Sequence, residues 1–232
     1  MEFKILRFKP GRIDPPRYET FALSADPAMT VLDALEVIRL SRDTGLMYRH
    51  SCHHSSCGTC AMQINGEARL ACTTRIGDLD GDTVTLEPLK GFPPVADLVV
   101  DMTTLYMDID PHWTCLKPSE TPPAKSAAEQ GTIPPTRLED CIECGCCVSA
   151  CPVLSQDRAF MGPAALAALH NELTKNPKSR NELLTQAGEP HGEPGCRRAL
   201  NCSRVCPTGV YPARHIADLR KIRKTAQSEK NA

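Results

Sequence analysis

Two stretches of the chain differ in how apolar and polar residues follow one another. In the first, alternating residues predict strands at 3–8, 18–23, 61–64, 68–71 and 83–86. Pro15-Pro16 marks a turn after the first of these, and Asn65-Gly66 is the favoured pair for a type I′ hairpin turn. Between the two hairpins, apolar residues recur at helical spacing over 31–40. This order predicts a small mixed sheet crossed by one helix.

The second stretch favours helices and follows a proline-rich segment. Six prolines within residues 111–137 exclude a regular helix there. Beyond it, Pro163 fits the first position of a helix over 164–173, and further helices are predicted over 181–186 and 213–224. We therefore expect an N-terminal domain over 1–110, a linker over 111–137 and an all-α domain over 138–232.

Charge and composition limit which neighbours and which cellular compartment suit this chain. The formal net charge is -1, but residues 1–110 hold 11 Lys/Arg against 16 Asp/Glu, and the remainder holds 16 against 12. The two halves should therefore face different neighbours. The N-terminus mixes charged and apolar residues, and no stretch approaches the roughly 20 apolar residues of a membrane helix. The sequence predicts a chain that is soluble by itself, without a signal peptide, and kept in a reducing compartment.

Eleven of the thirteen cysteines form three groups whose spacing is typical of iron-sulfur ligation. The first group has the plant-type spacing C-x4-C-x2-C followed by a more distant cysteine, which predicts a 2Fe-2S cluster. The second is the bacterial run C-x2-C-x2-C-x3-C-P of cubane clusters, and the third also ends in Cys-Pro. With these clusters, the chain is predicted to be α+β: an N-terminal β-grasp 2Fe-2S ferredoxin domain, then an α-helical ferredoxin domain.

The last cysteine of each later run is expected to cross to the other cluster, as in two-cluster ferredoxins. This rule completes one 4Fe-4S centre and leaves the other one ligand short, because Ala199 stands where the fourth cysteine is expected. A cubane lacking one protein ligand readily loses an iron, which predicts a 3Fe-4S centre. The predicted ligand sets are Cys52, Cys57, Cys60 and Cys72 for 2Fe-2S; Cys141, Cys144, Cys147 and Cys206 for 4Fe-4S; and Cys151, Cys196 and Cys202 for 3Fe-4S.

Other metal sites fit the cysteines less well. Tetrahedral zinc, the general alternative for a cysteine cluster, explains neither three such runs nor the Cys-Pro endings. A Rieske centre needs two histidines, and although Cys52-x-His54 matches half of that pattern, Cys60 occupies the second position. His53 and His54 are therefore expected to be solvated loop residues.

Two cysteines fall outside the three groups. Cys146 adjoins Cys147 and cannot easily face the same cluster, so we expect a small, buried, apolar residue. Cys115 lies in the linker and is expected to be a free thiol.

The sequence has neither a nucleotide-binding glycine motif nor a convincing acid/base or nucleophile constellation. Nothing in it points to a nucleic acid partner. Three one-electron carriers without a two-electron cofactor cannot oxidise or reduce an organic substrate alone. The chain therefore needs a donor subunit and an acceptor site.

Segments spread over nearly the whole chain carry a family resemblance: residues 4–8, 51–52, 57–60, 69–72, 98–102, 141–152, 160–164 and 201–207. In these segments the chain resembles the iron-sulfur subunits of succinate dehydrogenase and fumarate reductase. The three clusters with one ligand missing from the third also match that family.

The resemblance implies the electron-transfer subunit of a succinate:quinone oxidoreductase or quinol:fumarate reductase, not catalytic alone. A separate flavoprotein would interconvert succinate and fumarate on FAD, and a membrane anchor of cytochrome b type would hold a quinone beside the 3Fe-4S centre. The subunit would be peripheral, on the cytoplasmic face of the cytoplasmic membrane. Arg49, His50 and the loop over 52–60 would lie nearest the flavin. Basic residues of the last helix would suit anionic headgroups, although such a run is more often a solvated face.

In this family the quinone site lies beside the third cluster, and Pro152, Gln156 and Arg197 fall in the corresponding segments. Relatives that use ubiquinone carry a Trp and a His there. This chain has neither, which favours menaquinone or another low-potential partner. An Arg at position 197 could equally form an exposed salt bridge.

Two other functions remain open at this point. One is the iron-sulfur subunit of a fumarate reductase that takes electrons from a thiol or a soluble donor and not from a quinone. The other is a free ferredoxin, although three centres in one chain with oppositely charged halves suit a fixed complex better.

Overall fold

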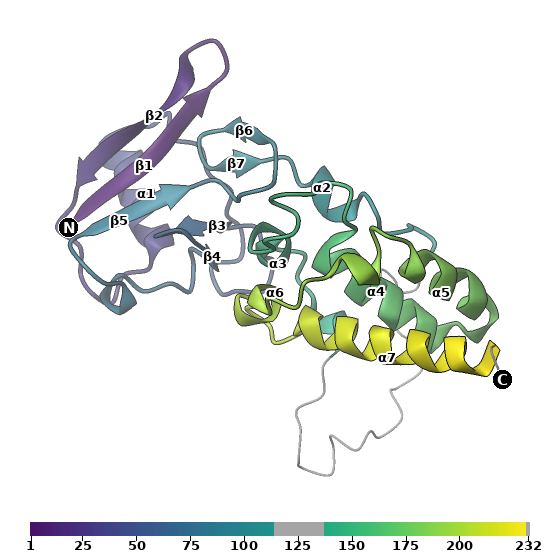
Figure 1. Cartoon of the computed structure of the whole chain (residues 1–232). Coiled ribbons are helices and arrows are strands. Elements are labelled where there is room, and N and C mark those ends of the chain that lie inside the picture. Colours follow the sequence, from purple (N-terminus) through teal and green to yellow (C-terminus); the bar gives the residue numbers. More distant parts are fainter. Residues whose placement is uncertain (114–136, 231–232) are drawn as a thin grey trace. The chain divides into compact units, whose positions relative to one another are not determined.

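The structure, a computed structural model, describes residues 1–113 and 137–230 (Figure 1). Its contacts divide into two compact units, Met1–Thr104 with Ile142–Ala150, and Leu105–Cys141 with Cys151–Ala232. Each unit is described by itself. Most of the predicted linker and Cys115 lie outside the described residues. The predicted division at residues 110 and 137 does not place Ile142–Ala150 with the N-terminal unit, as the contacts do.

The first unit contains a five-stranded mixed sheet in the order β2-β1-β5-β3-β4. β1 and β5 are parallel, whereas the β1/β2, β3/β4 and β3/β5 pairs are antiparallel. The predicted order of strand, strand, helix, hairpin and strand is therefore confirmed. The elements are β1 (Glu2–Lys9), β2 (Ile13–Ala22), α1 (Val31–Ser41), β3 (Ala61–Ile64), β4 (Glu67–Leu70) and β5 (Thr83–Glu87).

The predicted turn at Pro15-Pro16 is wrong. The chain turns at residues 10–12, where Gly11 has a φ of +71°, and both prolines lie inside β2. β2 is an edge strand. A proline there costs little, because an edge strand has N–H groups that no neighbouring strand uses.

Helix α1 begins at a capping box in which Thr30 Oγ1 accepts from Asp33 N at 3.1 Å and Asp33 Oδ2 accepts from Thr30 N at 2.9 Å. The backbone of Val31 and Leu32 also donates to the carbonyls of Thr74 and Ala71, which fixes the helix start beside the end of the β3/β4 hairpin. The helix and the sheet bury one apolar core. Its members include Phe3, Ile5, Leu32, Leu35, Ile38, Met62, Ile64 and Leu86.

A buried charge cluster fixes the segment that leads into the first cysteine loop. Asp97, which is fully buried, accepts from Arg7 Nε at 3.1 Å, from Phe8 N at 3.0 Å and from Met47 N at 2.9 Å. Arg7 also pairs with Asp43 at 2.6 Å. Burial alone would lower the pKa of Arg7, but the bonds to Asp97 and Asp43 outweigh it and raise the pKa.

The sequence patterns do not predict several short elements. β6 (Pro94–Ala96) and β7 (Val99–Val100) form a two-stranded sheet around Asp97. The chain also forms α2 (Thr103–Tyr106), α3 (Cys146–Ser149) and α6 (Asn201–Arg204). Each spans too few residues to show a period of its own.

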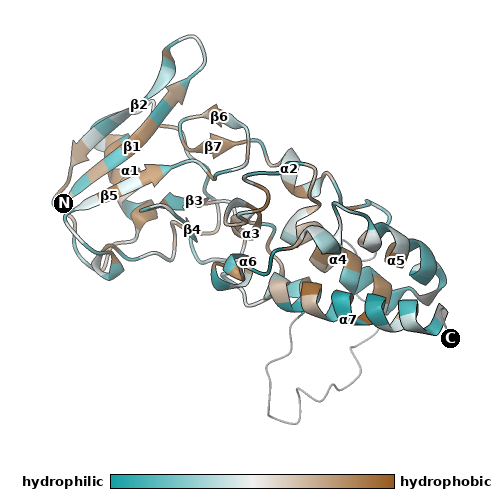
Figure 2. Ribbon diagram, viewed as in Figure 1, coloured by the Kyte–Doolittle hydropathy of each residue, from teal (hydrophilic) through white to brown (hydrophobic). Residues whose placement is uncertain are grey.

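The second unit is helical, as predicted. Its longer helices are α4 (Gly162–Lys175), α5 (Arg180–Gly188) and α7 (Pro212–Lys230), and Pro163 stands in the first turn of α4. α4 packs along α7 and against α5, and apolar and hydrophilic residues alternate along α7 (Figure 2). The shared core includes Leu166, Leu169, Leu183, Ile216 and Leu219. Among the described helices, none combines the length and the apolar character needed to cross a membrane.

A histidine pair lies in the interface of α4 and α7. The Nδ1 atoms of His170 and His215 are 2.9 Å apart, and the two rings meet edge to face. His215 is buried, and its Nε2 has no hydrogen-bond partner among the described residues. Burial, followed by the charge of His170, lowers the pKa of His215 to about 4. Burial also lowers the pKa of His170, so both rings are neutral at neutral pH.

Candidate metal centres

Below, the first, second and third groups are the predicted ligand sets of the 2Fe-2S, 4Fe-4S and 3Fe-4S centres. The first group lies in one loop between α1 and β3 and just after β4. Cys52, Cys57 and Cys60 come from this loop, and Cys72 follows β4. The backbone N–H of Ser55 donates to Cys72 Sγ at 3.4 Å, which joins the loop to the end of the hairpin. The structure thus brings all four predicted ligands of the 2Fe-2S centre into one region.

The loop directs hydrogen-bond donors at these sulfurs. Ser56 N donates to Cys52 Sγ at 3.3 Å, Thr59 Oγ1 to Cys57 Sγ at 3.0 Å, and Cys72 N to Cys60 Sγ at 3.4 Å. Such donors stabilise thiolates, the form that binds iron. The donor set and its sulfur chemistry fit an iron-sulfur cluster.

The environment separates the pKa values of these cysteines. The pKa of Cys52 is lowered to about 6, first by the backbone N–H of His54 and then by Cys57. Burial raises the pKa of Cys60 to about 12. His53 and His54 are exposed, as predicted, although His53 also lies 3.1 Å from a ring nitrogen of His50.

Gly58 brings this loop against the segment that carries the second cysteine group. Its φ is +68°, and a Cβ added there would meet the carbonyl oxygen of Ile142 and lie 2.9 Å from Cys144 Cα. Both segments belong to the first unit. Two cysteine groups that are far apart in sequence therefore lie in direct backbone contact.

The second group lies around α3. Cys144 is buried just before the helix and Cys147 lies within it, whereas Cys141 and Cys206 belong to the other unit. The grouping of these four as ligands stays a prediction. Ser149 on α3 accepts a 2.8 Å hydrogen bond from the buried Gln63 of β3, which fixes the helix to the sheet.

Cys146 is fully buried, as predicted, but it is more than an apolar residue. A hydrogen bond from its side chain is the largest of the influences that lower the pKa of Cys144 to about 7. The sequence spacing gave no sign of this contact.

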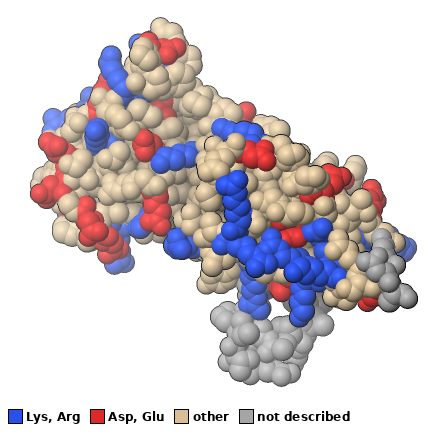
Figure 3. All heavy atoms as spheres, in the orientation of Figure 1, with Lys and Arg blue, Asp and Glu red and all other residues tan. Residues whose placement is uncertain are grey.

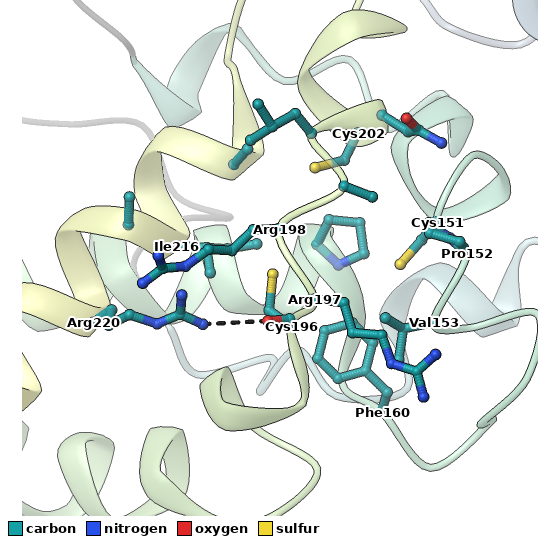
Figure 4. A pocket seen from close by; sticks show the side chains of 16 residues that line it. Cys151, Pro152, Val153, Phe160, Cys196, Arg197, Arg198, Cys202, Ile216 and Arg220 are labelled. Carbon is teal, nitrogen blue, oxygen red and sulfur yellow. Dashed lines mark hydrogen bonds between the residues drawn. The ribbon is translucent and has the colours of Figure 1, made fainter.

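The third group lines a cavity of about 270 Å³ in the second unit. Cys151 precedes a loop before α4, Cys196 follows a short 3-10 helix, η6 (Glu193–Gly195), and Cys202 lies on α6. Figure 4 shows their three sulfurs turned toward a common space. The structure therefore brings together the three predicted ligands of the 3Fe-4S centre.

Ala199, the position predicted to lack a ligand, lines the same cavity as the three cysteines. Burial, followed by the charges of Cys151 and Cys196, raises the pKa of Cys202 to about 11. Thiols that influence one another in this way lie close together. This donor set fits a cluster with three protein ligands.

The predicted quinone residues also meet at this cavity. Pro152 and Arg197 line it, and Arg197 Nη1 donates to Gln156 Oε1 at 2.7 Å. Arg197 thus binds a neutral amide here, not the carboxylate of the alternative salt bridge. Most of the cavity wall is apolar, with contributions from Val153, Phe160 and Ile216.

Positive charge gathers along α7 on the face that Figure 3 presents. Arg214, Lys221 and Lys224 are exposed there, but Arg220 and Arg223 are largely buried and pair with Glu193. The predicted basic run therefore contains two residues with an internal partner. Sequence reasoning missed this, because no spacing rule connects Glu193 with a helix that begins nineteen residues later.

Two family models match the chain. A 2Fe-2S iron-sulfur cluster binding domain matches residues 2–107, and a 4Fe-4S dicluster domain matches residues 137–210. Together with the sheet and the helices, these matches confirm the predicted fold class.

Curated relatives resemble the chain over nearly its full length. A succinate dehydrogenase iron-sulfur subunit of Coxiella burnetii is 36% identical, covering 96% of this chain and 95% of the relative. A fumarate reductase iron-sulfur subunit of Haemophilus influenzae is 31% identical, over 93% and 90% of the two chains. A succinate dehydrogenase iron-sulfur subunit of Paracoccus denitrificans is 32% identical, over 95% and 86%.

A solved structure shares the fold. A chain of the Mycobacterium smegmatis Sdh1 complex in the apo form aligns with a TM-score of 0.75, over 98% of this chain and 96% of that one, at 23% identity. The fold, the cysteine groups and the relatives agree. The chain belongs to the family of iron-sulfur subunits of succinate dehydrogenase and fumarate reductase.

Proposed function

We propose that this chain passes electrons one at a time between the FAD of a flavoprotein subunit and a quinone held at a membrane-anchor subunit. The ligands are the three predicted cysteine sets, for 2Fe-2S, 4Fe-4S and 3Fe-4S centres. The clusters supply the one-electron chemistry when bound. The protein's own part is to hold, space and insulate them.

One observation carries the proposal: the contact between the loop of the first group and the segment of the second. At Gly58 the two backbones approach so closely that a methyl group does not fit. Electron transfer between centres needs a short, fixed separation. Gly58 allows such a separation, because it carries only a hydrogen where other residues have a Cβ, and this hydrogen faces Ile142 and Cys144.

The hydrogen-bond donors around the first group support the assignment of its ligands. N–H and O–H groups point at Cys52, Cys57, Cys60 and Cys72, and hydrogen bonds to sulfur are among the factors that set a cluster's reduction potential. At the third group, Ala199 supplies no sulfur. The 3Fe-4S assignment rests on that alanine and on the three sulfurs that share its cavity.

The cavity beside the third group is suited to a quinone. Its wall is mainly apolar, as a hydrophobic ring and tail require, and Arg197 at its edge can donate to a carbonyl. Leu200, which is 56% exposed, lines the same cavity and offers an apolar contact to a membrane-anchor subunit. Menaquinone is the proposed quinone, since no Trp or His stands at the corresponding positions.

Docking of the partners follows the charge of the two halves. The acidic N-terminal half, with His50 and the loop over 52–60, is proposed to face the flavoprotein. The basic helical half is proposed to face the anchor on the cytoplasmic side of the membrane. Exposed Arg214, Lys221 and Lys224 can meet anionic headgroups there.

The native complex, purified anaerobically, tests the function. We expect it to transfer electrons from succinate to a menaquinone analogue and from the quinol to fumarate. Fumarate reduction driven by a thiol or a soluble donor, with no reaction toward either menaquinone or ubiquinone analogues, would establish the alternative function. Elution of the native protein near its chain mass of 25.3 kDa would instead identify a free ferredoxin.

A further inference from the structure

A buried carboxylate lies just before Cys196. Glu193 is 2% exposed and begins the 3-10 helix η6, which ends one residue before that cysteine. Removing a carboxylate from water is costly unless cations and donors replace the water. Glu193 has two such partners, Arg220 and Arg223, both from α7.

The two arginines differ in what else they bind. Arg223 pairs with Oε2 of Glu193. Arg220 pairs with Oε1, and its Nη2 also donates to the carbonyl oxygens of Glu193 at 3.4 Å and of Cys196 at 3.3 Å. Figure 4 shows this last bond at the edge of the cysteine-lined cavity. Only Arg220 therefore connects the buried carboxylate to a cysteine of the third group.

The planar guanidinium suits this arrangement. Its donors lie in a rigid fork, so binding to the carboxylate fixes the direction of the donors that reach the Cys196 carbonyl. Both side chains are largely buried, with 16% of Arg220 and 3% of Glu193 exposed. Screening by water is weak at such sites, so the charge of Arg220 acts strongly on its neighbours.

We infer that Glu193 and Arg220 form a clamp that positions Cys196 and that, with Arg223 on the same carboxylate, leaves one net positive charge beside the third centre. The inference rests on the proposed function, because it requires a cluster on Cys151, Cys196 and Cys202. Both are positioning residues: Glu193 aims Arg220, and Arg220 fixes the Cys196 backbone. A cation at this place favours the state with one more electron, so the clamp raises the reduction potential of the centre.

Arg223 provides a matched control inside the same cluster. Arg220→Gln and Arg223→Gln each remove one positive charge and one partner of Glu193, at sites with 16% and 13% exposure. They differ in the bond to Cys196. Arg220→Lys is a further variant that keeps the charge and loses the fork.

The experiment is a redox titration of the native complex followed by EPR, with iron content and thermal unfolding measured alongside. We expect Arg220→Gln to shift the midpoint potential of the third centre to more negative values, by several times the shift in Arg223→Gln. Arg220→Lys should shift it less than Arg220→Gln and broaden its signal. Both Gln variants should unfold at similarly reduced temperatures, because each removes one ion-pair partner of the buried Glu193.

Equal shifts in the two Gln variants, or none in either, would overturn the inference and leave Glu193 a structural residue only. If Arg220→Gln loses iron selectively from the third centre while Arg223→Gln retains it, positioning is supported. Loss of iron from the third centre in both Gln variants would contradict positioning by Arg220. The absence of a third-centre signal from the unmodified complex would instead overturn the proposed function, so the two failures are distinguishable.

Discussion

The contact at Gly58 gives the sharpest test of how the first two cysteine groups are held together. In Gly58→Ala, the new methyl group would lie 2.9 Å from Cys144 Cα and closer still to the Ile142 carbonyl oxygen, where ordinary contact begins near 3.4 Å. Both neighbours are backbone atoms and cannot swing aside. The segment must therefore move by about half an ångström or more at Cys144.

Two costs add in this variant. A φ of +68° disfavours alanine by about 1–2 kcal/mol. Overpacking against fixed backbone adds about 1–3 kcal/mol. We therefore expect a loss of about 2–5 kcal/mol in the free energy of unfolding.

Gly66→Ala is the control, because Gly66 has a φ of +82° but nothing within 4 Å of the added Cβ. It should lose only the backbone part, about 1–2 kcal/mol. Anaerobic chemical denaturation measures both variants, and EPR of the complex reports the first and second centres. Gly58→Ala should also perturb the second centre's signal. Equal losses of stability in the two variants, with unchanged EPR signals, would refute the reasoning.

Three further predictions concern single residues. Asp97→Ala leaves Arg7 buried without its main partner and should lower the free energy of unfolding by about 3–5 kcal/mol in chemical denaturation. The control Glu67→Ala, which removes a half-exposed partner of Arg69, should lower it by less than about 1 kcal/mol, and similar losses in the two variants would contradict the role of the cluster. The folded-state pKa of His215, about 4, lies below its ordinary 6.5, so the unfolded state binds a proton first as pH falls. The contribution of the neutral ring to stability is therefore complete above pH 6.5 and is lost as pH falls toward 4. Between pH 6.5 and pH 4 the free energy of unfolding should fall by about 3 kcal/mol in the unmodified chain and by much less in His215→Gln. The same pH dependence in both would contradict the role of His215. Ala199→Cys adds a fourth thiol to the third cavity and should abolish the oxidised 3Fe-4S EPR signal while raising the iron content by about one atom per chain; retention of that signal would show that position 199 does not reach the cluster.

Much of the fold follows from local patterns that the sequence displays directly. Alternation located β1, β3, β4 and β5 within a residue or two, and Pro163 marked the first turn of α4. The predicted turn near Pro15 is misplaced because proline is common in turns but is also accepted in an edge strand such as β2. β6 and β7 are not predicted because each spans only two or three residues, and the partners of Asp97, in the turn between them, lie far away in sequence.

The sequence likewise predicts only part of each candidate site. Cysteine spacing predicts which residues meet in the first group, because three of its four ligands lie in one compact loop. The crossing rule of two-cluster ferredoxins predicts that Cys151 joins Cys196 and Cys202 in the third group. The contacts that surround them are not local. Gly58 against Ile142, Cys146 beside Cys144 and Arg220 with Glu193 all depend on tertiary packing or on a side-chain direction that no spacing encodes.

EPR spectroscopy of the anaerobically purified, air-oxidised complex, with iron counted per chain, tests the central claim most directly. The account predicts a 3Fe-4S signal in the oxidised sample, a 2Fe-2S signal after reduction, and about nine iron atoms per chain. An intact complex without the 3Fe-4S signal would contradict it. So would a metal content dominated by zinc.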